Sequence, residues 1–275
     1  MSAPAIEFLN PTVRPTATRT RLWLSLARAV ILESLRRKDL YVVGILGFLL
    51  MVSAGTLGFF GLQGLETFAK DLATTVLGLF STIVAVLTGS RLMPDEIRNR
   101  TLYPLLARPM SRFDLIMGKF LGAVAVTWIA FGILAVLTGL ALALFGVRFE
   151  AVMGQYLLLK SLGLAVVCAV SLCLSMVMTP SAAATMGFVL AFGTTMIVRA
   201  LTMAYETASP AMQWLFKLVN AALPQYGLFD MGSRAANSGW GPVPLWVVGA
   251  LLGYAVCYSS AMLALAWLKF RRQVV

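Results

Sequence analysis

Long apolar runs alternate with short charged stretches along this chain of 275 residues. Six runs have close to the roughly 20 apolar residues that a helix needs to cross the hydrocarbon core of a bilayer. They lie at 40–62, 72–90, 115–145, 156–178, 182–203 and 245–268. Apolar and polar residues do not alternate in these runs as they do in membrane-barrel strands, and a helix satisfies its own backbone hydrogen bonds in lipid. The pattern predicts an all-α membrane protein with six transmembrane helices, in a single transmembrane domain that spans residues 1–275.

The segment 21–38, ahead of the first run, has the pattern of an amphipathic helix. Its polar residues fall on one narrow face at about 100° per residue; they are Arg21, Ser25, Arg28 and Arg36. Apolar residues cover the rest of the helix, as in helices that lie in a membrane interface. We therefore expect an N-terminal interfacial amphipathic helix within a cytoplasmic segment 1–39. It is either a simple juxtamembrane anchor or, as we prefer, a mechanical linker to the first span.

Composition supports the membrane assignment. Hydrophobic residues make up 60% of the chain and charged residues 12%, about half the charged fraction of a soluble domain. The net charge is +11, which in a soluble protein would suggest nucleic-acid binding. Here the basic residues flank apolar runs, where orientation in the membrane and anionic lipid explain them. We expect membrane lipid, and no nucleic acid, as their partner.

The distribution of basic residues also predicts the orientation of the chain in the membrane. An even number of spans places both termini on one side of the membrane. The chain has 22 Lys and Arg residues. Sixteen of them lie on one side, namely before the first span, in and next to the loop between the second and third spans, or after the sixth span. The other six lie on the opposite side. The positive-inside rule then makes both termini and the loop 91–114 cytoplasmic, and the loop 204–244 extracytoplasmic.

The loop 204–244 is predicted to contain a short helix. Ser209 and Pro210 are suited to its N-cap and first helical position, and Pro224 ends it. The apolar residues between them indicate a helix that lies against or dips into the outer leaflet. Trp240 and Trp246 suit the aromatic belt at the membrane surface.

Several kinds of chemistry are excluded by missing residues. The chain has no histidine, so a Ser–His dyad, an H-E-x-x-H zinc site and a histidine-ligated haem are all impossible. No G-x-x-x-x-G-K-[ST] motif exists, so the chain has no P-loop for nucleotide. The three cysteines, Cys168, Cys173 and Cys257, form no C-x-x-C pair and are interpreted as buried, inert thiols. We expect no catalytic residue, no metal site and no cofactor on this chain.

Ion-coupled transporters usually keep ionisable residues near the membrane midplane. Arg148, Lys160 and Arg199 lie toward the outer ends of their helices, where their long side chains can extend to the interface. A secondary transporter is therefore disfavoured, and the driving energy is expected from elsewhere. Gly118 and Gly122 form a G-x-x-x-G pair, but the intervening Lys119 makes it a weak helix-packing signal.

The loop 91–114 is unusually charged for so apolar a chain. Pro94 is suited to the first turn of a short helix, with Asp95 and Glu96 at its positive end. Ser111 followed by Asp114 resembles a capping box that begins the third span. Leucines ringed by charge suit docking onto a partner protein. The alternative is a positively charged loop that only sets orientation.

The passage DEIRNRTLYPLLARPMSRFDLIMGK resembles the cytoplasmic loop of ABC transporter permeases of the type-2 exporter class. Within that class it is most similar to permeases associated with multicopper-enzyme maturation. The family pattern is matched by Glu96, Thr101-Leu102, Leu105-Leu106, Pro109, Ser111-Arg112 and Gly118-Lys119. Arg100 stands where the family often has glycine, which puts the local turn in doubt. The order of predicted segments agrees with the same class.

The resemblance implies a permease subunit with no catalytic role of its own. Two such subunits, identical or similar, would sit in a bacterial cytoplasmic (inner) membrane on separate cytoplasmic ABC ATPase subunits, which bind the ATP and Mg. Residues 95–108 would form a coupling helix seated in a cleft of the ATPase. The residues implied in coupling are Asp95, Glu96, Arg98, Thr101, Leu102, Leu105, Leu106, Arg108, Pro109 and Arg112.

In this family the second and fifth spans line the translocation path. The candidate path residues are Thr74, Thr75, Thr194, Thr195, Met196 and Arg199. Helix packing by small polar residues explains such threonines equally well. The leading hypothesis is a permease subunit of an ATP-driven exporter; a non-transporting anchor for a cytoplasmic partner and a secondary transporter are the alternatives. Few fixed charges in the spans favour an amphipathic or lipid-like cargo over a bare ion.

Overall fold

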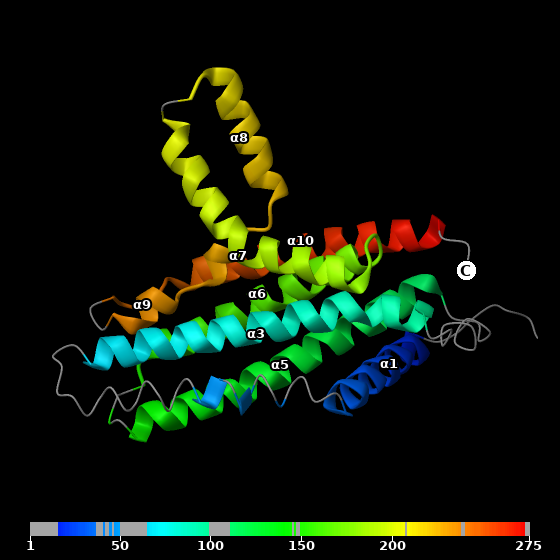
Figure 1. Cartoon of the computed structure of the whole chain (residues 1–275), viewed down its shortest axis with the longest axis horizontal. Coiled ribbons are helices and arrows are strands. Elements are labelled where there is room, and N and C mark those ends of the chain that lie inside the picture. The colour runs from blue at the N-terminus through cyan, green and yellow to red at the C-terminus, as the bar shows by residue number, and fades with distance from the viewer. Residues whose placement is uncertain are drawn as a thin grey trace, which may run out of the picture.

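The computed structural model describes residues 16–36, 41, 44, 45, 47–49, 65–98, 111–144, 146, 149–206, 208–237 and 240–272. The secondary structure of these ranges is helical. The elements are α1 (Thr16–Arg36), α3 (Leu65–Arg98), α5 (Arg112–Leu144), α6 (Ala151–Ser175), α7 (Pro180–Tyr205), α8 (Pro210–Ala222), the 3₁₀ helix η2 (Tyr226–Phe229), α9 (Gly232–Ala236) and α10 (Leu245–Arg272). The long helices run side by side, with α1 and the C-terminus at one end and α9 at the other (Figure 1).

Five helices of the described ranges are long and apolar enough to cross a membrane, namely α3, α5, α6, α7 and α10. They correspond to the predicted second to sixth spans, so these predictions are confirmed as helices. The predicted first span, 40–62, lies mostly outside the described residues. Its described positions 41, 44, 45 and 47–49 are helical, and a sixth span stays a prediction.

Two helices begin earlier than hydropathy predicts. α3 begins at Leu65 and α6 at Ala151, one to two turns before the apolar runs. In α3 the early residues include Lys70, which is 2% exposed and donates to the 34% exposed Glu150 at 2.9 Å. A charged side chain that is neutralised inside the bundle does not end a helix, although it lowers the hydropathy of its segment.

Pro94 does not begin a separate helix, and that prediction is wrong. α3 continues through Pro94 to Arg98. A proline inside a helix removes one backbone hydrogen bond, but here it lies only one turn from the helix end. The backbone of residues 95–98 is therefore a direct extension of α3.

The core forms around α3, which packs on α5, α6, α7 and α9. Small residues allow these helices to approach closely. A Cβ added at Gly89 of α3 would lie 2.7 Å from the Cβ of Ser171 on α6, and one added at Gly187 of α7 would lie 2.8 Å from Val86. Such crossings are typical of membrane helices, whose association depends on packing rather than on exclusion of water.

α1 packs lengthwise on the first turns of α5. Leu26 and Val30 are buried there because Gly118 and Gly122 provide a groove: added Cβ atoms would lie 2.6 Å and 2.7 Å from these two side chains. The interpretation of this glycine pair as a weak signal is thus wrong. A helix is present where the N-terminal helix was predicted, with Leu24, Leu32 and Leu35 exposed; its amphipathic character and its place in the membrane interface stay predictions.

The start of α5 has the predicted capping box. The Ser111 hydroxyl accepts from the backbone N–H of Asp114 at 3.1 Å and donates to the Asp114 carboxylate. The same carboxylate accepts from the Trp23 indole N–H at 3.0 Å. Asp114 therefore links the cap of α5 to α1.

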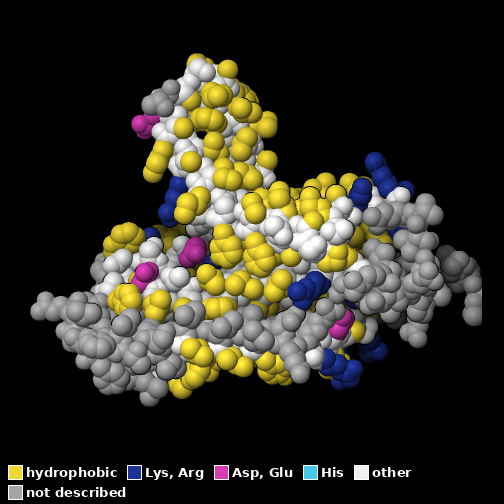
Figure 2. All heavy atoms as spheres, viewed as in Figure 1, with side chains coloured by type: hydrophobic (Ala, Val, Ile, Leu, Met, Phe, Trp, Pro, Cys, Tyr) yellow, Lys and Arg dark blue, Asp and Glu magenta, His cyan; other side chains and the backbone are white. Residues whose placement is uncertain are grey.

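The end of α7 and α8 form a hairpin that projects from the bundle (Figure 1). As predicted, Ser209 occupies the N-cap position of α8 and Pro210 its first turn, although the serine side chain makes no capping bond. α8 buries none of its residues, and Trp214 and Leu218 are exposed. Figure 2 shows hydrophobic side chains over most of this hairpin. Its position against an outer leaflet stays a prediction.

Candidate functional site

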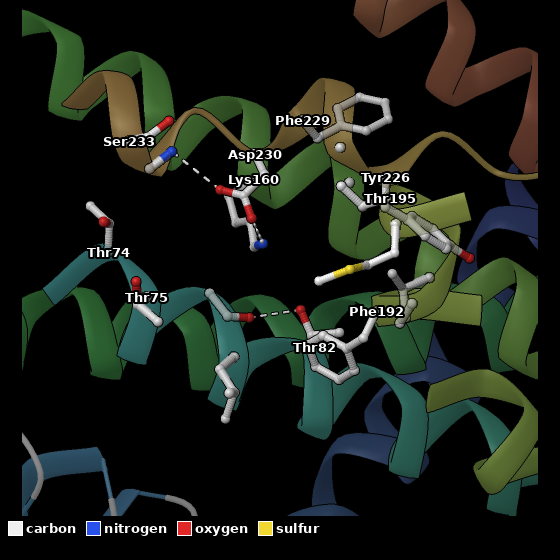
Figure 3. Close-up of a pocket in the computed structure, with 18 of the residues that line it drawn as sticks. Thr74, Thr75, Thr82, Lys160, Phe192, Thr195, Tyr226, Phe229, Asp230 and Ser233 are labelled. Atoms are coloured by element: carbon white, nitrogen blue, oxygen red, sulfur yellow. Dashed lines mark hydrogen bonds and ion pairs between the residues drawn. The ribbon is translucent and has the colours of Figure 1, made fainter. Parts of the chain in front are cut away.

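A cavity of about 450 Å³ lies between α3, α6, α7 and the segment 226–236, which comprises η2 and α9. We call this segment the inserted segment. It belongs to the loop before α10 and closes one side of the cavity at the α9 end of the bundle (Figure 3).

Glycines make room for the inserted segment. Phe229 is 1% exposed and lies over Gly163 of α6, where an added Cβ would be 2.8 Å from the Phe229 Cβ. Gly232 lies against Thr74 of α3, with 3.1 Å between an added Cβ and the Thr74 hydroxyl. The segment is thus wedged between α3 and α6.

The residues that precede the inserted segment are tied to α10. The Tyr254 hydroxyl accepts from the backbone N–H of Gln225 at 3.1 Å, and the Tyr258 hydroxyl donates to the carbonyl of Ala222 at 3.0 Å. The rings of Phe229 and Tyr254 lie 6.0 Å apart. α10 therefore holds the inserted segment in place from outside.

Hydroxyl groups line the cavity from three sides. They belong to Thr74, Thr75, Thr82, Thr195 and Ser233. Thr74 donates to the carbonyl of Asp71 at 3.0 Å, and Thr82 donates to that of Gly78 at 2.7 Å. Because these protons are used within α3, the two oxygens present lone pairs rather than protons to the cavity.

Four charged side chains also line the cavity: Asp71, Lys160, Arg199 and Asp230. The Lys160 ammonium pairs with Asp230 Oδ2 at 3.2 Å, and the side chains are 13% and 53% exposed. The Asp230 Oδ1 accepts from the backbone N–H of Gly232 at 3.1 Å. The prediction that Lys160 extends to the membrane interface stays a prediction, because its ammonium pairs with a carboxylate that is itself exposed.

The remaining wall is apolar and includes Leu79, Phe192, Met196 and Phe229. Tyr226, on the inserted segment, also lines it, and burial raises the pKa of this phenol well above its ordinary value. Tyr226 is thus neutral. A cavity with hydroxyls and paired charges on one side and hydrocarbon on the other can accommodate an amphipathic molecule.

The predicted path residues largely come together here. Thr74, Thr75, Thr195, Met196 and Arg199 line the cavity. Thr194 does not: it is fully buried on another face of α7, and its hydroxyl donates to the carbonyl of Leu190 at 2.7 Å. Their role in translocation stays a prediction.

Sequence reasoning missed the residues that other segments bring to the cavity, chiefly Lys160 and Asp230. A lysine within an apolar run is a functional-site hypothesis by default, so Lys160 could have been found. Asp230 carried no comparable signal, because hydropathy does not reveal that its loop inserts between helices.

The predicted coupling residues cannot be placed in the same detail. Thr101, Leu102, Leu105, Leu106, Arg108 and Pro109 lie outside the described residues, and for Asp95, Glu96 and Arg98 the helical backbone alone is described. Arg112 donates to the carbonyl of Phe270 at 2.7 Å, and its guanidinium lies 5.3 Å from the centre of that ring. Arg112 thus ties the start of α5 to the end of α10, where a cation is favourable.

The three cysteines are free thiols. Cys168 is buried, as expected, and Cys173 is partly buried, but Cys257 is exposed on α10, so the prediction of burial is wrong for it. In the described part of the chain, no group of three or more Cys, Asp or Glu side chains is placed to hold a metal ion.

Comparison with known proteins agrees with this arrangement of apolar helices. The family model described as "ABC-2 family transporter protein" matches residues 31–273. The chain is 29% identical over 279 aligned positions to the probable ABC transporter permease protein NosY of Pseudomonas aeruginosa, with 91% of this chain and 98% of that protein covered. The matched region includes the cavity and all five membrane-crossing helices. This chain therefore belongs to the ABC-2 family of transporter proteins and is a membrane permease subunit of an ABC transporter.

Proposed function

We propose that this chain is the permease subunit of an ATP-driven exporter in a bacterial cytoplasmic membrane. A separate cytoplasmic ATPase subunit docks on the loop 91–114 and binds ATP and Mg, and a second permease subunit, identical or similar, completes the transporter. The cavity between α3, α6, α7 and the inserted segment is the part of the path that receives cargo.

The observation that carries this proposal is the continuity of α3. One helix of 34 residues, about 51 Å long at 1.5 Å per residue, bears Thr74, Thr75 and Thr82 of the cavity wall in its first half and at its middle. Its C-terminal end is the segment 95–98, which the proposal places against the ATPase. A displacement of that segment would reach the cavity wall along one helix, which contains Pro94 one turn before its described end.

The distribution of charge supports the orientation. α3 ends, α5 begins and α10 ends at the same end of the bundle, and this end carries Arg91, Arg112, Lys269, Arg271 and Arg272. Figure 2 shows Lys and Arg side chains gathered near the C-terminal end. By the positive-inside rule this end faces the cytoplasm. The cavity then lies in the outer half of the membrane.

One observation favours a second candidate, a secondary transporter. The Lys160–Asp230 pair joins an enclosed ammonium to a half-exposed carboxylate at the cavity, and ionisable groups within membrane bundles are typical of ion-coupled carriers. Membership of the ABC-2 family weighs against it. Transport in ATP-depleted vesicles that keep a proton gradient would support the secondary transporter and contradict the proposal.

The experiment that tests the proposal is co-purification of the tagged chain from its native cells with an ABC ATPase subunit, followed by reconstitution in lipid nanodiscs. We expect a stable complex whose ATP hydrolysis differs from that of the free ATPase. Leu102→Asp should abolish both binding and this change, whereas Arg272→Asp, which also introduces an aspartate but lies outside the loop 91–114, should preserve them. Normal ATPase binding and coupling in Leu102→Asp would contradict docking on the loop 91–114.

A further inference from the structure

The Lys160–Asp230 ion pair joins two very different environments. Lys160 lies about 14 Å along α6 from its first residue, at 1.5 Å per residue, and its side chain is 13% exposed. Asp230 lies between η2 and α9 on the inserted segment, outside any regular helix, and its side chain is 53% exposed. The cation is therefore enclosed by the bundle, while its counter-ion lies at the surface.

The position of the ammonium is fixed by the helices. A Cβ added at Gly78 of α3 would lie 3.1 Å from Lys160 Nζ and 3.2 Å from the Tyr156 hydroxyl. The Tyr156 hydroxyl in turn donates to the carbonyl of Thr74 at 2.7 Å. The ammonium thus rests against the bare backbone of α3, where the absence of a side chain at Gly78 leaves room for it. Because Lys160 belongs to α6, its backbone stays in the bundle when the inserted segment moves.

The position of the carboxylate depends on the inserted segment. Asp230 is held by Lys160 and by the N–H of Gly232, a residue of the same segment. If the segment leaves the cavity, the carboxylate leaves with it. A partly desolvated ammonium without a counter-ion is strongly unfavourable, so another anion must then take the place of Asp230.

The charge balance of the cavity also favours an anion in the place of Asp230. With Asp230 in place, the charges of Asp71, Lys160, Arg199 and Asp230 cancel. Without it, the cavity carries one net positive charge beside an apolar wall. A cationic cargo would meet repulsion there, and an anionic one would restore neutrality.

We propose that Lys160 is an anion-binding residue of the cavity, that Asp230 is its displaceable internal counter-ion, and that the cargo carries an anionic group such as a carboxylate, phosphate or sulfate. This inference rests on the proposed function, in that it takes the cavity as the cargo site. The same chemistry is offered by a soluble anion and by the headgroup of an anionic lipid.

Equilibrium binding of radiolabelled inorganic sulfate to the full chain tests the proposal. The chain is held in nanodiscs of phosphatidylcholine, without or with phosphatidylglycerol. Asp230→Asn removes the internal competitor and should bind sulfate at least tenfold more tightly than the wild type. Lys160→Gln, alone or combined with Asp230→Asn, should reduce binding to background.

Asp71→Asn is the matched control, because it removes a carboxylate from the same cavity without freeing Lys160. We expect its sulfate affinity to stay within threefold of the wild type. Equal affinities for Asp71→Asn and Asp230→Asn, or unchanged binding in Lys160→Gln, would overturn the proposal. If phosphatidylglycerol suppresses sulfate binding to Asp230→Asn, the site takes a lipid headgroup; if it does not, the site takes a soluble anion. Both results uphold the anion site.

Asp230→Asn leaves Lys160 unpaired and can reduce the yield of folded protein. In that case the proposal predicts that sulfate restores a monodisperse protein better than chloride at equal ionic strength, and that the double variant needs no sulfate. Equal yields in the two salts would overturn it. A failed anion test with an intact ATPase complex would leave the proposed function standing, whereas sulfate binding without any ATPase partner would reject the proposed function and keep the anion site.

Discussion

α1 lies so close to α5 that Gly122 has no room for a side chain. A Cβ added there would be 2.7 Å from the Cβ of Val30, whereas carbon atoms in contact are normally about 3.5–4.0 Å apart. Since both are Cβ atoms attached to helix backbones, no rotamer change relieves the clash, and the helices must separate by about 1 Å. We therefore expect Gly122→Ala to destabilise the protein by about 1–3 kcal/mol, as overpacking does elsewhere.

Unfolding in mixed micelles of increasing SDS content, followed by tryptophan fluorescence, measures this effect. Gly132 on the same helix is the matched control: an added Cβ would have no neighbour within 4 Å, so Gly132→Ala should leave the stability unchanged or raise it by up to about 1 kcal/mol through helix propensity. Val30→Gly in the Gly122→Ala background moves the glycine to the other helix. It should recover at least about 1 kcal/mol in a double-mutant cycle.

The reasoning is refuted if Gly122→Ala and Gly132→Ala have equal stabilities. It is also refuted if Val30→Gly destabilises the two backgrounds equally, because the contact would then not couple the two positions. Either result would mean that α1 does not rest in the groove of α5.

Three further substitutions test other contacts between the helices and segments of the fold. Gly163→Ala should destabilise by about 1–3 kcal/mol through overpacking in the same unfolding assay, because its Cβ would lie 2.8 Å from that of Phe229; wild-type stability would contradict the wedged position of the inserted segment. Asp114→Ala should cost about 1–2 kcal/mol and shift the Trp23 emission to the red, since the indole N–H loses its acceptor; an unshifted spectrum would contradict the contact. Arg112→Ala should speed hydrogen exchange in the last turn of α10, whose carbonyls it caps; unchanged exchange would contradict that role.

The spans after the first were predictable because lipid forces each crossing segment to be a long apolar helix. The errors lie where a polar residue is satisfied inside the bundle. Lys70 lowers the hydropathy of its segment, yet the Glu150 carboxylate neutralises it and α3 extends past it. Proline often marks a helix boundary, but the backbone of α3 continues through Pro94. A local sequence pattern cannot show which residue, distant in the chain, offsets the free-energy cost of burying a charge such as that of Lys70.

The cavity was predictable on one wall. Thr75 of α3 and Thr195 of α7 both line it, and the resemblance to ABC permeases had singled out these two spans. The opposite wall was not predictable, because Phe229 and Asp230 lie in a loop of mixed composition. Their partners, Gly163 and Lys160, are some seventy residues away, and no pattern of period 3.6 connects positions in different helices.

The central claim is that an ATPase bound at the loop 91–114 opens the cavity by moving α3 against the inserted segment. The most direct test is the distance between spin labels at Thr75→Cys on α3 and Ser233→Cys on the inserted segment, in a chain whose native cysteines are replaced by serine. We expect the distance in the nanodisc complex with the ATPase to lengthen when ATP is bound, and to stay unchanged when Leu102→Asp removes the docking contact. A distance that is the same with and without ATP in the intact complex would contradict the account.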